Sequence, residues 1–123
     1  MDALPINELS GEEFACKTGN MYACGHDIHT AMLWTTARML KEDEDHLHGT
    51  VKLMFQSAEE IFKGANDMIE HGILDNPRPD AAMAYHMMIG KNQVGTYMYN
   101  AGVIMMNSVD EFKITIHGKG THG

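Results

Sequence analysis

The chain has 123 residues, 44% of them apolar, which suits a single domain of ordinary size with a buried core. Its 9 basic and 17 acidic residues give a formal net charge of −8. A chain with this negative charge is not expected to bind nucleic acid, because phosphate binding needs clustered Lys and Arg. Two cysteines cannot form a disulfide framework, and no apolar run approaches the roughly 20 residues that a membrane helix needs. We therefore expect a cytoplasmic protein without nucleic-acid or membrane partners.

The first part of the chain is predicted to contain a loop, a helix and a strand. Glycine and proline interrupt residues 1–25, which are expected to be irregular. Residues 27–41 are predicted to be helical, because apolar or small side chains recur at helical spacing, at Ile28, Ala31, Met32, Thr35 and Met39. Residues 50–56 have a continuous apolar centre, which is typical of a strand buried on both faces of a parallel sheet.

A second helix and a second apolar strand are predicted next. The helix extends from about residue 60 to residue 71, with Gly72 as its C-terminal stop. Residues 81–86 form the short apolar run that follows. This strand–helix–strand order indicates an α/β fold with a mainly parallel central sheet flanked by helices.

The pattern changes near Asn107. Residues 94–100 and 109–117 are predicted to be strands, and in the second of these apolar side chains alternate with polar ones. Such alternation is typical of a half-exposed strand in an antiparallel sheet. The prediction is therefore one domain at 1–107 and the start of another at 108–123.

The strongest local signal is the segment Cys24-Gly25-His26-Asp27-Ile28-His29, which places several potential ligands at the entry to a helix. Thiolate and imidazole groups bind zinc and similar metals. Cys24 and His26 lie on the same side of an extended loop and can reach one metal, whereas Asp27 and His29 suit a second layer that orients the ligands. Asp27 as a direct ligand, and a helix N-terminus with surface histidines, are the alternatives.

Two further signals follow the predicted strands. Glu59-Glu60 comes just after residues 50–56, where α/β folds place their sites, so one carboxylate can bind metal while the other accepts a proton. His86 ends the next strand and would meet Glu60 at the same sheet edge. The alternatives are two acids that favour a helix N-terminus, and a core histidine. The glycine-rich residues 118–123 lack phosphate-loop spacing and are expected to form a turn.

Taken together, the motifs resemble a family of amidohydrolases, peptidase family M twenty, subfamily D, which includes hippurate hydrolase, bacterial N-acyl amino acid amidohydrolases and plant indole-acetyl-amino-acid hydrolases. The matching stretches follow the family's order along the whole chain: Met1-Asp2-Ala3-Leu4-Pro5, Cys24 to Ala31, Phe55 to Glu60, Ala84-Tyr85-His86 and Phe112 to Gly123. Each motif is moderately specific, and the ordered set is highly specific. The resemblance implies a zinc-peptidase-like catalytic domain, followed by the first strand of an α+β lid or dimerisation domain.

The resemblance also implies a role for each matched residue. Cys24, His26, Glu60 and His86 match ligands of two divalent ions, which zinc, manganese, cobalt or nickel would suit. Glu59 matches the general base, and Asp2 the acid that supports the metal site through a neighbouring ligand or base. His122 matches a lid histidine that helps to bind substrate and stabilise the oxyanion, often across a homodimer interface. Ser57 stands where the family often has proline, a change that we expect to be tolerated.

Three functions remain open from the sequence. The first is hydrolysis of the amide bond of N-acyl amino acids or small peptides by a metal-activated water. The second is residual metal binding by an inactive fragment. In the family, the catalytic domain begins before the segment that matches Asp2 and returns after the lid to supply a last histidine ligand, and the resemblance implies that this sequence lacks both parts. The third makes Cys24 a nucleophile paired with His26 or His29.

Overall fold

The computed structural model describes residues 2–102, 106 and 108–122, and it divides into two units, residues 1–89 and 90–123. Each unit is described by itself. The domain boundary predicted near Asn107 lies outside the described residues and stays a prediction. The helices and the candidate site belong to the first unit.

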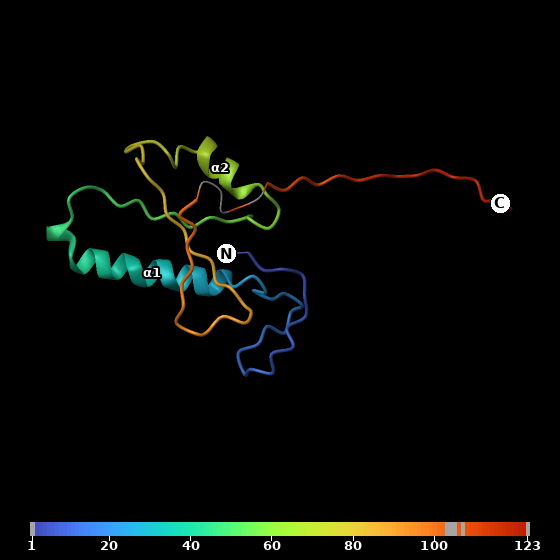
Figure 1. The fold of residues 1–123 in the computed structure, drawn as a ribbon, viewed down its shortest axis with the longest axis horizontal. Helices are drawn as coiled ribbons and strands as arrows, with labels where there is room; N and C mark the ends of the chain where they lie inside the picture. Colours follow the sequence, from blue (N-terminus) through green and yellow to red (C-terminus); the bar gives the residue numbers. More distant parts are fainter. Residues whose placement is uncertain (1, 103–105, 107, 123) are drawn as a thin grey trace. The chain divides into compact units, whose positions relative to one another are not determined.

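The first helix, α1, covers His26–Glu42 and confirms the helix predicted over residues 27–41 (Figure 1). It begins after Gly25, whose φ of 82° is left-handed, a conformation that glycine adopts without steric cost. Asp43 caps its C-terminal end, and the N–H of Asp43 bonds to the carbonyl of Met39 at 3.2 Å. A short 3-10 helix, η1, follows at Glu44–His46.

The inward face of α1 differs from the apolar face suggested by the sequence. Among the positions at helical spacing, Ile28, Met32 and Met39 are exposed. Trp34, on the same helix, is 63% exposed. The half-buried residues instead follow a neighbouring stripe made of His26, His29, Thr30, Leu33, Ala37 and Leu40. The helix therefore turns two imidazoles, rather than its methionines, toward the rest of the unit.

The second helix, α2, covers only Gly64–Glu70 and is shorter than the predicted segment of residues 60–71. The preceding residues form a tight turn, because the N–H groups of Lys63 and Gly64 both bond to the carbonyl of Ala58, at 3.2 and 3.1 Å. Gly64 is essential to this turn, since a Cβ there would lie 1.5 Å from the carbonyl oxygen of Ser57. Gly72, with a φ of 80°, follows α2 as predicted.

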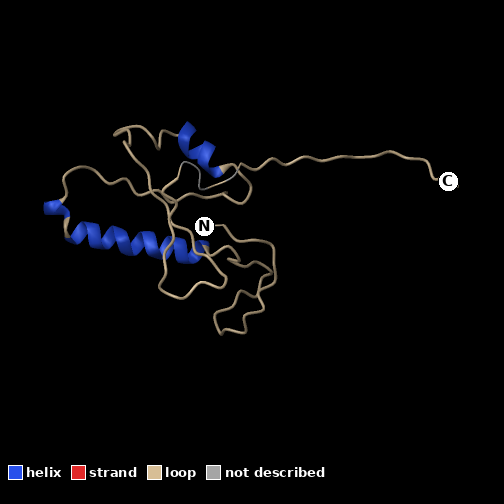
Figure 2. Cartoon of the chain, viewed as in Figure 1, coloured by secondary structure: helices blue, strands red, loops and turns tan. Residues whose placement is uncertain are grey.

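The described residues contain no strand, and their only β-type pairing is an isolated antiparallel bridge between Leu4 and Met21 (Figure 2). The strands predicted at residues 50–56, 81–86, 94–100 and 109–117 are therefore not confirmed, and neither is the central sheet. The sequence patterns show that these side chains suit a sheet. A strand forms only when its N–H and C=O groups also pair with a neighbouring strand.

Polar contacts hold the first unit together more than apolar packing does. Lys52 donates from its ammonium group to the backbone carbonyls of Ile73, Asp75 and Pro77, at 2.9, 2.5 and 3.0 Å. By contrast, no apolar side chain in the described part of the chain is fully buried. The accessible surface of the chain is 11976 Å², whereas a compact protein of this size exposes about 6,600 Å². Within the described ranges, no helix is long and apolar enough to cross a membrane.

Candidate metal centre

The turn into α1 brings Cys24 and His26 to one side of the first unit. The N–H of Gly25 bonds to the carbonyl of Tyr22 at 2.9 Å, and the left-handed Gly25 then directs the chain into the helix. His26 is the first residue of α1, and its side chain is 12% exposed. Cys24 is half-buried and is not part of a disulfide. The helix start therefore presents a thiol and an imidazole at the same place.

Asp2 holds the turn that carries the two glutamates. Its Oδ1 accepts the N–H of Ala58 at 2.7 Å, and its Oδ2 accepts the N–H of Glu60 at 3.1 Å. Burial raises the pKa of Asp2, but backbone N–H groups of Glu60, Ala58 and Glu59 outweigh that effect and hold this pKa below its ordinary value. Ala58 has a φ of 55°, which costs a residue with a Cβ some strain. The carboxylate of Asp2 therefore stabilises the strained turn that contains Glu59 and Glu60.

His26 faces both glutamates. Its Nε2 lies 3.5 Å from Oε2 of Glu59 and 3.7 Å from Oε1 of Glu60. Both distances are too long for good hydrogen bonds. Oε1 of Glu60 is buried and has no hydrogen-bond partner, which is costly for a carboxylate unless another group satisfies it. The imidazole nitrogen and the two carboxylate oxygens therefore lie close together without good hydrogen bonds between them, as the ligands of a cation would.

His86 presents a lone pair toward Cys24. Its Nδ1 lies 2.6 Å from the carbonyl oxygen of Met87, and Nδ1 must carry the hydrogen because a carbonyl only accepts. In the neutral ring, Nε2 is then unprotonated, and it lies 3.4 Å from Sγ of Cys24. Burial first, and then the charge and hydrogen bond of Glu60, raise the pKa of Cys24. The thiol therefore keeps its proton unless a cation replaces it.

His29 lies between the other two imidazoles. Its ring centroid is 5.4 Å from that of His26 and 4.4 Å from that of His86, in an edge-to-face arrangement with the latter. Its Nε2 accepts the N–H of Met87 at 3.0 Å. Burial, together with the neighbouring His86 and His26, lowers the pKa of His29, and this outweighs the opposite effect of Asp27 and Glu59. His29 is thus a neutral hydrogen-bond acceptor.

The spacing of these groups fits metal coordination. Two sets have ligand atoms within 4.8 Å of one another, Cys24 with His26 and His86, and His26 with Glu59 and Glu60. Tetrahedral ligands bonded to zinc at about 2.0–2.3 Å lie about 3.3–3.8 Å apart. Three pairs of potential ligand atoms, at 3.4, 3.5 and 3.7 Å, match that separation. Because His26 belongs to both sets, the two positions are adjacent.

Most of the site residues predicted from the sequence lie in this cluster, namely Asp2, Cys24, His26, His29, Glu59, Glu60 and His86. Asp27 is exposed on the first turn of α1 and acts on His29 through its charge. His122 is exposed and belongs to the second unit. The sequence analysis missed Met87, which contributes through its backbone, and no side-chain pattern could have revealed it.

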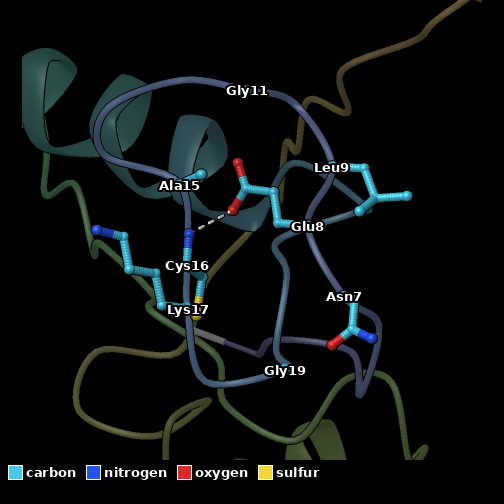
Figure 3. A pocket seen from close by; sticks show the side chains of 8 residues that line it. All are labelled: Asn7, Glu8, Leu9, Gly11, Ala15, Cys16, Lys17 and Gly19. Carbon is cyan, nitrogen blue, oxygen red and sulfur yellow. Dashed lines mark hydrogen bonds between the residues drawn. The ribbon is translucent and has the colours of Figure 1, made fainter.

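A separate open hollow is formed by the loop from Asn7 to Gly19 and contains none of the predicted site residues (Figure 3). The N–H of Cys16 donates to Oε2 of Glu8 at 2.9 Å, and the hydroxyl of Ser10 donates to Oε1 at 2.7 Å. Glu8 therefore closes the loop on itself. This arrangement explains the local shape and needs no ligand.

Comparisons with known proteins place the chain in a family. The model of the family described as peptidase family M20/M25/M40 matches residues 1–121. The chain is 46% identical to N-acetyl-L-cysteine deacetylase of Bacillus subtilis, 43% to IAA-amino acid hydrolase ILR1-like 5 of Arabidopsis thaliana, and 42% to N-acyl-L-amino acid amidohydrolase of Geobacillus stearothermophilus.

These alignments cover 99%, 99% and 100% of the chain but only 29%, 27% and 33% of the relatives, so the chain spans a third of their length or less. No solved structure matches. The family model matches nearly the whole sequence, and the chain belongs to peptidase family M20/M25/M40.

Proposed function

We propose that the chain carries the metal centre of a hydrolase that cleaves the amide bond of N-acyl amino acids or small peptides. The observation that carries this proposal is that potential ligand atoms of Cys24, His26 and His86 lie within 4.8 Å of one another, with the carboxylates of Glu59 and Glu60 beside His26. Enzymes of the M20 family depend on metals. The names of the three relatives each describe an acyl or related group removed from an amino acid.

The proposed ligands are Cys24, His26, Glu60 and His86, which would hold two divalent ions. Thiolate, imidazole and carboxylate groups together suit zinc, manganese, cobalt or nickel. The difference in exposure supports separate roles for the two glutamates, since the side chain of Glu60 is 25% exposed and that of Glu59 is 51% exposed. The more enclosed carboxylate, with its unpartnered oxygen, suits a ligand, and the more accessible one suits a base.

In this proposal the residues of the chain move protons and hold the reacting groups. Divalent cations supply the chemistry of lowering the pKa of water and polarising the substrate carbonyl. Glu59 accepts the proton of the attacking water and later gives it to the leaving amine. Asp2 keeps the turn beneath Glu59 in place through its bonds to Ala58 and Glu60. His122 would stabilise the negative oxygen of the tetrahedral intermediate.

The two alternatives differ in how well the site supports them. A nucleophilic Cys24 would need a thiolate at neutral pH, and the raised pKa of this thiol argues against it. Metal binding without turnover is consistent with every contact described above. Only an activity measurement separates that alternative from hydrolysis.

The test compares Glu59→Gln with Glu60→Gln, two substitutions of the same size at adjacent positions. Zinc affinity is measured by calorimetry, and hydrolysis of an N-acetyl amino acid by amine release, in this chain and in a longer protein that contains it. We expect Glu59→Gln to bind zinc normally and lose at least about 99% of turnover, since a missing general base costs about 10²–10⁴-fold. Glu60→Gln should lose zinc affinity.

Each result decides between the candidates. Turnover retained by Glu59→Gln would remove Glu59 as the base. Zinc binding without turnover in either protein would favour the metal-binding alternative, and no zinc binding would contradict both. A homodimer, a cytoplasmic location and the absence of nucleic-acid and membrane partners stay predictions.

A further inference from the structure

The backbone of Met87 joins two imidazoles of the candidate metal centre. Its carbonyl accepts the Nδ1 hydrogen of His86 at 2.6 Å, while its N–H donates to Nε2 of His29 at 3.0 Å. One residue therefore fixes the protonated nitrogen of one ring and is itself held by the other ring. The side chain of Met87 takes no part in either bond.

These two bonds dictate the same protonation state in both neutral rings, with the hydrogen on Nδ1. Nε2 of His29 must be unprotonated to accept an N–H, so its hydrogen is on Nδ1. His86 also carries its hydrogen on Nδ1, which leaves its Nε2 free to face Cys24 at 3.4 Å. A histidine that binds metal commonly donates its other ring N–H to a carbonyl, and this bond sets the orientation of the ring. Here His29 holds the N–H of the same residue whose carbonyl accepts the hydrogen of His86.

We propose that His29 is a positioning residue for His86 and acts through the main chain of Met87. The proposal rests on the proposed function, because it assigns His86 to a metal. His29 lies on the inward face of α1, so the helix that supplies His26 also fixes the segment that supplies His86. His26 and His86, the two histidines grouped with Cys24, are therefore both positioned by α1.

His29 serves this role better than it would serve as a ligand. Its Nε2 lone pair is occupied by Met87, and its Nδ1 carries the hydrogen. The set that contains Cys24, His26 and His86 also has its ligand atoms close together without His29. Replacing His29 should therefore weaken metal binding by Cys24, His26 and His86 more than metal binding near Glu59 and Glu60.

The first test measures ring protonation in the metal-free 123-residue chain. Long-range ¹H–¹⁵N NMR correlations report which nitrogen of each histidine carries the hydrogen. We expect Nδ1–H in both His29 and His86. We also expect His86 to become a mixture of both forms in His29→Phe, which keeps a ring but loses the acceptor, and to keep Nδ1–H in His29→Gln, which places an amide oxygen near the position of Nε2.

The second test measures cobalt binding by the same variants. The thiolate-to-cobalt absorption band reports the set that contains Cys24. We expect His29→Phe to lower the cobalt affinity, measured by this band, by about 10- to 100-fold. That is the usual effect of losing a residue that orients a ligand. His29→Gln should stay near wild type. His48→Phe is the matched control, because His48 is exposed and outside the cluster.

The outcomes separate this inference from the proposed function. His29 protonated on Nε2, an unchanged His29→Phe variant, or equal loss in His29→Phe and His29→Gln would each overturn the role of His29. Failure of the wild-type chain to bind cobalt would instead contradict the proposed metal centre, and the NMR result would still decide whether His29 positions His86.

Discussion

Asp2 shows how one carboxylate can order a turn that lies far away in the sequence. Its two oxygens each accept one backbone N–H, from Ala58 and from Glu60, and these bonds hold the pKa of Asp2 low, although burial opposes them. Both oxygens must therefore be acceptors. Asparagine has a similar shape but offers only one acceptor, since its NH₂ group is a donor.

Asp2→Asn is predicted to loosen the turn at residues 58–60. One backbone N–H would then face a donor instead of an acceptor, and the free energy of opening the turn would fall by about 1 kcal/mol. This corresponds to an increase of about fivefold in the opening equilibrium. Hydrogen exchange of the Ala58 or Glu60 amide should speed up by about that factor. Asp80→Asn, at an exposed position, is the control and should leave both amides unchanged. Unaltered exchange in Asp2→Asn would show that the turn does not depend on this carboxylate.

At the level of single residues, the sequence predicted the side chains of the site but not the contacts between them. Cys24 and His26 stood out because several potential ligands fall within six residues, whereas Glu60 and His86 received their roles from the order of the motifs and the family resemblance. Met87 could not be recognised, because its contribution is an N–H and a carbonyl that almost every residue has. Side-chain identity carries information only about contacts that side chains make.

Among the elements, the loop from Asn7 to Gly19 depends most directly on one charge. The N–H of Cys16 and the hydroxyl of Ser10 lower the pKa of Glu8 below its ordinary value of 4.5. A carboxyl with a depressed pKa stabilises the folded loop above its unfolded-state pKa, and this stabilisation is lost as the pH falls through the lower, folded-state pKa. The loop should therefore stay closed at neutral pH and open in acid.

A pH titration followed by NMR tests this dependence. The amide shift of Cys16 should follow the ionisation of Glu8, with a midpoint below 4.5 in buffer and a higher midpoint in denaturant. Glu8→Gln should remove the titration from the Cys16 amide. A buffer midpoint at or above the denaturant value would show that the ionised carboxylate does not hold the loop.

The helices were easier to predict than the strands for a physical reason. The hydrogen bonds of α1 connect residues four apart, so periodicity and Gly25 were sufficient to locate it. The bonds of a strand connect distant segments, so the apolar run at residues 50–56 could indicate only a tendency. The burial of α1 was also misjudged, because its inward face was set by His26 and His29 rather than by the apolar residues.

For the whole molecule, the large accessible surface has a direct effect on unfolding. From a surface of 11976 Å², complete unfolding would expose about 8,000 Å² more, compared with about 13,000 Å² for a compact protein of this length. The slope of unfolding free energy against urea scales with that newly exposed area. The isolated chain should therefore respond weakly to denaturant.

Urea unfolding of the metal-free chain, followed by far-UV circular dichroism, is predicted to give a slope about 60% of that for a compact protein of the same length. The transition should be broad, since little apolar surface becomes exposed cooperatively. A compact protein of equal length is the reference. A slope equal to the reference would contradict the small newly exposed area.

The two ligand sets have a consequence for the stability of the first unit. Their members come from the start of α1, the turn at Glu60 and the segment at His86, and Cys24 and His86 are 62 residues apart. A divalent cation at this place would cross-link segments that, among the described residues, are not joined by fully buried apolar side chains. Its binding free energy would then contribute to the stability of the folded unit. For this chain a chelator would then lower the stability of the first unit.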